Sequence, residues 1–130
     1  MKFDKGFLIC GLLFGVAGLV LGIYMAASQN HAQFVTHAHT LLIGFVLSLI
    51  YAVIHRLWLD RPQRTIATVQ FLLHQTAAVV VSVGLFLAFG GYFPIGRLEP
   101  ILGAASIGVL VALLLMLYMV LRSGGEGVST

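Results

Sequence analysis

Charged side chains are scarce in this chain of 130 residues: Lys, Arg, Asp and Glu together make up 8% of it. A soluble domain carries about 25% charged residues, and hydrophobic residues reach 60% here. The few basic residues also form no stripe or patch of the kind that binds nucleic acid. We therefore expect an integral membrane protein whose surroundings are a lipid bilayer, with no nucleic-acid partner.

Cysteine and acidic residues are nearly missing as well. Cys10 is the only cysteine, so the chain can form no internal disulfide and no paired-thiol metal site. The chain has four carboxylates, and none lies beside the histidines at positions 37 and 39. This scarcity argues against a zinc or di-iron site.

What the chain does contain is four apolar runs, each close to the ~20 residues that cross a ~30 Å hydrocarbon core. They cover approximately residues 7–27, 34–57, 66–89 and 101–121. Each run is expected to be a helix, because a segment in lipid must satisfy its own backbone polar groups. Short connections predict antiparallel neighbours. The fold class is therefore all-α, a single four-helix transmembrane domain at 1–122 followed by a flexible polar tail at 123–130.

The basic residues predict the orientation of this bundle. Arg97 stands alone at one end of the predicted helices, and six cations flank the other end. These six are Lys2, Lys5, Arg56, Arg61, Arg64 and Arg122. Positive charge accumulates on the cytoplasmic side of membrane proteins, so both termini are predicted to be cytoplasmic.

A stripe of glycines marks the first run. Gly11, Gly15, Gly18 and Gly22 recur at spacings of four, three and four, which places them along one side of a helix. Small residues at this spacing let helices approach closely in lipid. The spacing alone leaves open whether the partner helix belongs to the same chain or to another copy.

The chain has five histidines, and two of them have simple interpretations. His31 lies in a polar loop, and His55 lies at a helix end, where an imidazole can sit among lipid headgroups. His74 is expected near the middle of the membrane, with Gln70 one turn before it and Gln75 beside it. It is either a ligand or a histidine satisfied by a hydrogen bond between helices.

His37 and His39 stand just inside the second apolar run. An ionisable side chain at membrane depth costs roughly 2.5 kcal/mol or more unless it is paired or ligated. Positions i and i+2 of a helix lie about 200° apart, so the two imidazoles are expected to point to opposite sides and cannot share one ion. Opposed ligands suit two separate cofactors, and neutral imidazole is a common axial ligand of haem iron.

The segments "GIYMAASQ", "THAHTLLIGFVLSLIYAVIHR" and "VQFLLHQTA" resemble the small four-helix bacterial membrane proteins related to subunit I of the haem-copper (cytochrome c) oxidases. The resemblance implies a multi-pass protein of the bacterial inner membrane that binds haem b. In that family a His-x-His supplies one axial ligand to each of two haems, and His37 and His39 match the pattern. His74 is a further candidate for cofactor binding.

The copper site of the active oxidases has no counterpart here. The family places a tyrosine four residues after a copper-binding histidine, whereas Ala78 follows His74 at that distance. Gln70 stands where small relatives often have a histidine. Copper is therefore not supported, and the chain is not expected to reduce oxygen on its own.

The resemblance also suggests an assembly. Subunit I of the oxidases resembles three arcs of four helices, and this chain supplies one arc, so three copies would complete the ring. In such a trimer His39 of one copy and His37 of the next would bind haem from two sides. The rival is ligation by His39 and His74 of one chain, although their expected depths differ by roughly 7 to 15 Å at 1.5 Å per residue.

Three functions remain open on the sequence. The first is a b-type cytochrome for electron transfer or for redox or gas response, with a partner in the respiratory chain. The second is transport of a transition metal or protons past polar side chains within the membrane. These side chains are Thr36, Thr40, Ser48, Gln70, Gln75, Thr76 and Ser82. The third is a haem-free assembly subunit of a respiratory complex.

Overall fold

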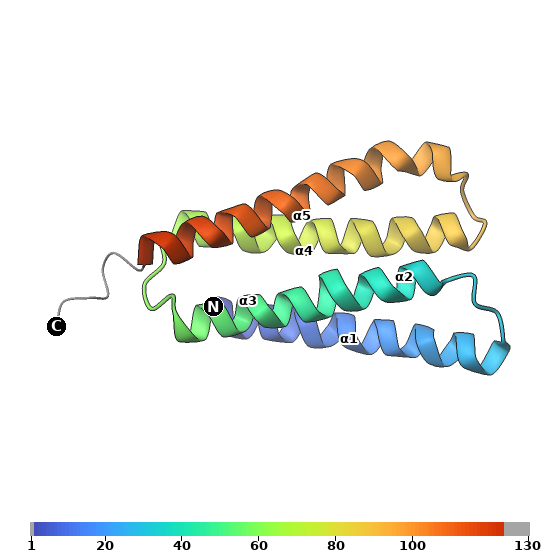
Figure 1. Ribbon diagram of the computed structural model, residues 1–130, viewed down its shortest axis with the longest axis horizontal. Coiled ribbons are helices and arrows are strands. Elements are labelled where there is room, and N and C mark those ends of the chain that lie inside the picture. Colours follow the sequence, from blue (N-terminus) through green and yellow to red (C-terminus); the bar gives the residue numbers. More distant parts are fainter. Residues whose placement is uncertain (1, 124–130) are drawn as a thin grey trace.

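The computed structural model describes residues 2–123, and Figure 1 shows two helical hairpins side by side. The first hairpin joins α1 (Phe3–Ser28) to a second span that runs from Phe34 to Leu57. The second hairpin joins α4 (Arg64–Phe89) to α5 (Ile95–Ser123). The predicted all-α fold is confirmed, and each of the four predicted spans is a helix long and apolar enough to cross a membrane. The tail predicted at 123–130 lies outside the described residues except for Ser123, which ends α5.

The second span is not uniform. It consists of α2 (Phe34–His39), a π-helical segment η1 (Thr40–Val46) and α3 (Leu47–Leu57). In η1 the N–H of Leu47 bonds to the carbonyl of Leu42, five residues back instead of four. The sequence predicted one regular helix over 34–57, so the wider turn is a feature that the structure adds.

The fourth span also begins earlier than predicted. α5 starts at Ile95, whereas the sequence predicts a start near Ile101, after a loop that ends at Pro100. Pro100 lies inside the helix, close to its beginning. Pro100 is the sixth residue of α5 and has no N–H, so the helix lacks the backbone bond that this position would otherwise make to the carbonyl of Gly96.

The two ends of the bundle differ in chemistry. We call the end that carries Lys2 and the α3–α4 loop the basic end, and the end that carries the start of α2 the histidine end (Figure 1). At the basic end the four spans converge on an apolar cluster that includes Phe7, Tyr51 and Met116. Most other large hydrophobic side chains are exposed, as expected of a surface that contacts lipid.

The glycine stripe of α1 packs against the second span of the same chain, which answers the question that its spacing left open. A Cβ on Gly15 would lie 2.9 Å from the Phe45 ring, and one on Gly18 would lie 2.5 Å from Leu41. Gly44 makes the reciprocal approach, facing Phe14 of α1. The two helices therefore pack closely because neither backbone carries a side chain at these contacts.

Candidate functional site

The imidazole of His37 lies against α1 in the space left by a glycine. Its Nδ1 is 2.8 Å from the carbonyl oxygen of Gly18. A Cβ on Gly22 would lie 2.7 Å from Cε1 of the ring. The ring is half-buried. α1 therefore sets both the position and the orientation of this histidine.

His39 has the same hydrogen-bonding pattern on a different surface. Its Nδ1 is 2.9 Å from the carbonyl oxygen of Val35, one turn back in the second span. Its side chain is exposed, whereas His37 contacts α1. The two imidazoles thus do not share one site within the chain.

The hydrogen bonds of His37 and His39 determine which ring nitrogen is available to a ligand. A carbonyl oxygen only accepts, so Nδ1 of each ring must donate its proton. The lone pair is then left on Nε2, which makes no hydrogen bond within the part of the chain that the structure describes. Metal-binding histidines commonly have this arrangement, because the second hydrogen bond fixes the tautomer and raises the basicity of the ligating nitrogen. Both residues therefore fit axial ligation through Nε2.

His74 lies in a different environment from the other two. It is fully buried, and its Nε2 is 3.1 Å from the carbonyl oxygen of Ile43 in η1. The ring of Tyr51 packs edge-on against it, with 5.0 Å between ring centroids. The structure does not bring His74 together with the exposed His39. Its hydrogen bond between helices matches one of the two sequence interpretations, with a backbone carbonyl as the partner instead of Gln70 or Gln75.

The π-helical segment explains how a backbone carbonyl can serve His74. In a regular helix every interior carbonyl is bonded to the N–H four residues on. The wider turns of η1 shift this pattern and present the Ile43 carbonyl to α4. π-helical turns are rare and often lie at functional sites. The residue pattern of this span contains no signal that would have predicted it.

Several polar side chains of the second span and of α4 are buried inside the bundle, and we call this set the polar seam. Its bonds include Thr40 Oγ1 to Ser82 Oγ at 3.1 Å and Gln75 Nε2 to Ser48 Oγ at 3.3 Å. Thr76, which the sequence grouped with these residues, is exposed instead. The buried members of the seam are Thr36, Thr40, Ser48, Tyr51, His55, Gln70 and His74.

Several polar atoms of the seam are enclosed without a partner. They are Tyr51 Oη, His55 Nε2, Gln70 Oε1, His74 Nδ1 and Gln75 Oε1. An enclosed polar atom without a hydrogen bond costs about 1–3 kcal/mol. Atoms of this kind are commonly satisfied by internal water. The seam is thus suited to hold water along the basic half of the bundle.

Metal binding by the chain's own side chains is restricted. Within residues 2–123, no three His, Cys, Asp or Glu side chains come together in a way that would hold a metal ion. A metal at His37 or His39 would therefore need further ligands from a cofactor or from another copy.

Comparison with known proteins adds no relative: no protein-family model matches the chain, and no curated protein or solved structure matches it. The resemblance to haem-copper oxidase subunit I thus stays a prediction that rests on the sequence motifs.

Proposed function

We propose that the chain is a membrane haem protein in which His37 and His39 each bind a haem b iron through Nε2. The observation that carries this proposal is the shared pattern of their hydrogen bonds. Each Nδ1 faces a backbone carbonyl oxygen, at 2.8 Å for His37 and 2.9 Å for His39, and each Nε2 is left without a partner. A bound haem would supply one-electron transfer or response to a gas. We place the protein in the bacterial inner membrane, with a redox partner in the respiratory chain.

The second axial ligand is the other part of the proposal. His37 faces α1 while His39 is exposed, so one chain does not offer both ligands to one iron. A neighbouring copy supplies the missing ligand if copies are arranged in a closed ring. We therefore propose a homotrimer in which His39 of one copy and His37 of the next hold each haem.

Optical spectra of the purified protein test the ligands. We expect a Soret band and sharp reduced α and β bands that do not respond to carbon monoxide, since two histidines leave no open position on the iron. His37→Ala and His39→Ala should each lose most of the haem, whereas His74→Ala should lose little. His31→Ala is the matched control, because His31 is exposed in the α1–α2 loop.

Two results would contradict the proposed ligands. A colourless wild-type protein, produced with ample haem, would exclude haem binding. Loss of haem in His74→Ala with full retention in His37→Ala would show that ligation is within one chain, and the trimer would lose its argument.

Mixing the two single variants tests the trimer itself. Each variant alone has no complete pair of ligands. In a closed ring each copy contacts the next one. In a random, equal mixture of the two variants, about a quarter of these contacts would join an intact His39 to an intact His37. Haem binding that returns to roughly this level after the variants are unfolded and reassembled together would support ligation between copies. If the mixture has the mass of a trimer but haem binding does not return, ligation between copies is refuted.

The polar seam supports a second candidate function, which is proton conduction. Its enclosed and unpartnered atoms offer sites for a chain of waters between Tyr51, Gln70 and His74. Ionisable residues inside a membrane bundle often line ion or proton paths. Proteoliposomes that hold a pH-sensitive dye should then acidify under a potential, and Tyr51→Phe should slow the flux severalfold. Flux that equals that of empty vesicles would leave electron transfer, or a haem-free assembly role, as the alternative.

A further inference from the structure

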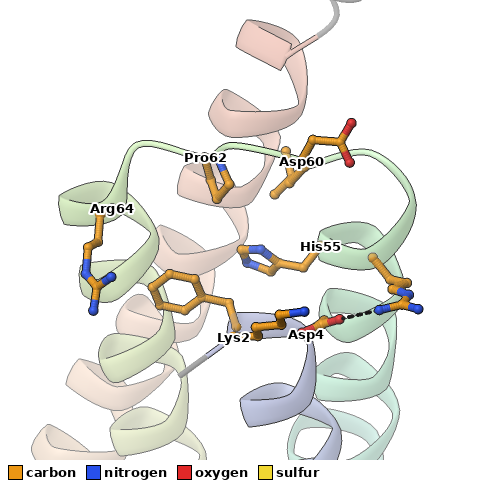
Figure 2. A pocket seen from close by; sticks show the side chains of 9 residues that line it. Lys2, Asp4, His55, Asp60, Pro62 and Arg64 are labelled. Atoms are coloured by element: carbon orange, nitrogen blue, oxygen red, sulfur yellow. Dashed lines mark hydrogen bonds and ion pairs between the residues drawn. The ribbon is translucent and has the colours of Figure 1, made fainter.

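A cavity of about 380 Å³ opens at the basic end, where the start of α1, the end of α3 and the start of α4 meet (Figure 2). Three cations line it: Lys2, Arg56 and Arg64. Neither the proposed haem ligands nor the middle of the polar seam reaches this cavity. Asp4 and Asp60 are the acidic residues of its lining, so the charged side chains around the cavity carry a net positive charge.

His55 provides the clearest sign of a ligand. Its side chain is only 6% exposed, and its Nε2 has no hydrogen-bond partner. The ring stacks against Phe3 and Phe7, with centroid distances of 5.4 Å and 5.6 Å. Figure 2 shows it directed into the cavity. The stacking holds the ring in place, and Nε2 keeps a hydrogen-bonding capacity that a molecule in the cavity can use.

The helix ends around the cavity also favour an anion. α4 begins at Arg64 and α1 at Phe3, and neither N-cap residue makes a side-chain capping bond. The free N–H groups and the positive end of the helix dipole attract negative groups such as phosphate. Asp4 already accepts the N–H of Lys5 in the first turn of α1, whereas α4 has no acidic residue in its first turn, so the start of α4 is the end that remains for an anion.

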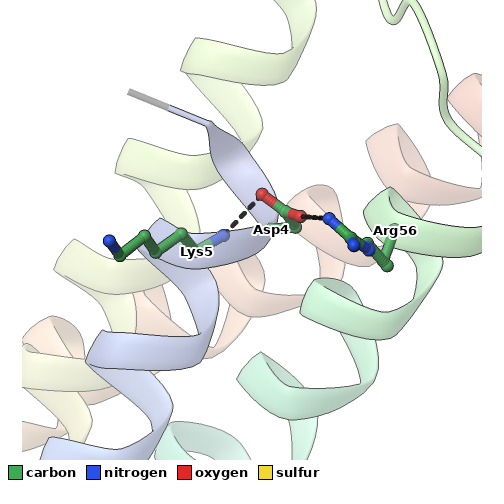
Figure 3. A network of polar contacts seen from close by, with 3 residues as sticks. All are labelled: Asp4, Lys5 and Arg56. Atoms are coloured by element: carbon green, nitrogen blue, oxygen red, sulfur yellow. Dashed lines mark hydrogen bonds and ion pairs between the residues drawn. The ribbon is translucent and has the colours of Figure 1, made fainter.

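The two carboxylates that line the cavity do not cancel this attraction. Asp4 forms an ion pair with Arg56 at 3.4 Å and accepts the N–H of Lys5 at 2.7 Å (Figure 3). The Asp60 carboxylate is exposed and points away from His55 in Figure 2. Lys2 and Arg64 thus remain without an acidic partner among residues 2–123.

An apolar groove lies next to the cavity. It has a volume of about 630 Å³ and is lined by Leu8, Leu49, Val53 and their apolar neighbours. Asp4 and Arg56 border both the groove and the cavity. A cationic cavity beside an apolar groove, at the end of a transmembrane bundle, is complementary to an amphiphile with an anionic phosphate head.

The geometry points to a specific binding site for an anionic phospholipid at the basic end of the bundle. The phosphate lies in the cavity and accepts hydrogen bonds from Lys2, Arg64 and the Nε2–H of His55. The first acyl chain lies in the groove between α1 and α3, with the Asp4–Arg56 ion pair between the two parts. This site is independent of haem and of the assembly proposed above.

Native mass spectrometry of the detergent-purified protein, with lipids added one at a time, tests this site. We expect one phosphatidylglycerol per chain, bound about tenfold more tightly than phosphatidylcholine. Arg64→Gln and His55→Phe should each weaken binding about fivefold to tenfold, because each removes a charge-assisted hydrogen bond to the phosphate. Phenylalanine retains the stacking with Phe3 and Phe7. Arg61→Gln is the matched control, since it removes a nearby cation that does not line the cavity.

Several outcomes would overturn the proposal. Equal weakening by Arg61→Gln and Arg64→Gln would show only a diffuse attraction to positive charge. If inorganic phosphate fills the cavity while the lipid stays bound to the protein, the cavity holds a soluble anion and the lipid is bound elsewhere. Diacylglycerol lacks the phosphate, so if it binds as tightly as phosphatidylglycerol, the headgroup site is excluded. If His55→Phe fails to fold, as judged by its melting temperature without lipid, Lys2→Gln at an exposed position provides the second test.

Discussion

The substitution Gly22→Ala tests whether α1 positions His37 for ligation. The added Cβ would lie 2.7 Å from Cε1 and 3.2 Å from Nδ1 of the His37 ring. Ordinary carbon contacts are at about 3.5–4.0 Å, so the ring has to move by about 1 Å. Its Nδ1 is held 2.8 Å from the Gly18 oxygen, and a shift of that size breaks or bends this hydrogen bond.

Two terms determine the expected change in stability. Loss of the hydrogen bond costs about 1 kcal/mol, and replacing glycine by alanine in a helix returns up to about 1 kcal/mol. The free energy of unfolding should therefore change by less than about 1 kcal/mol. Haem affinity should fall more, because the loss of an orienting hydrogen bond typically costs 10–100-fold in metal affinity.

Haem titration followed at the Soret band measures this effect, and thermal unfolding by circular dichroism reports on the fold. Gly103→Ala is the control, since Gly103 lies in α5 and a Cβ there meets no atom within 4 Å. We expect Gly22→Ala to bind haem at least tenfold more weakly than Gly103→Ala. Equal haem affinity in the two variants would refute the claim that α1 orients His37.

Three further substitutions have expected outcomes. Gly44→Ala should lower the free energy of unfolding by about 1–3 kcal/mol, because the new Cβ would lie 2.7 Å from Cβ of Phe14 and the two helices must separate; an unchanged melting temperature would contradict the close packing. Gln70→Met should change the free energy of unfolding by less than about 1 kcal/mol, because removal of the enclosed and unpartnered Oε1 is offset by loss of the Nε2 hydrogen bond to the Ala112 carbonyl, and it should slow any proton flux measured in vesicles; an unchanged flux would contradict a path past Gln70. Pro100→Ala should raise the melting temperature of the protein, because it restores an N–H that can bond to the carbonyl of Gly96; a lower melting temperature would show that α5 needs the proline.

The glycine stripe illustrates how far local patterns reach. Spacings of three and four residues are enough to predict that one side of α1 packs closely against a helix. They do not identify that helix, because any smooth neighbour satisfies the same pattern. The contacts of Gly15 with Phe45 and of Gly22 with His37 assign the stripe to the second span of the same chain. The stripe therefore gives no separate support for an interface between copies.

The histidines show a similar division. The sequence was sufficient to predict that His37 and His39 point to different sides of the helix, because an offset of two residues corresponds to a rotation of about 200°. It could not predict that both rings donate Nδ1–H to backbone carbonyls, nor that His74 bonds to Ile43. The bonds of His37 and His74 depend on α1 and on the π-helical turn, whereas the bond of His39 is local to α2. His55 was interpreted as a residue among headgroups, whereas it is buried between Phe3 and Phe7.

The sequence by itself determined the membrane class, the four spans and the gathering of cations at one end, because hydrophobicity and charge act over some twenty consecutive residues wherever the chain folds. Only the tertiary structure decided the π-helix at Thr40–Val46 and the polar seam along α4. Both depend on which atoms approach from other spans. In an apolar sequence many helix faces are equally able to contact lipid, so the choice of buried face is made by packing between spans and by the hydrogen bonds that polar side chains find there.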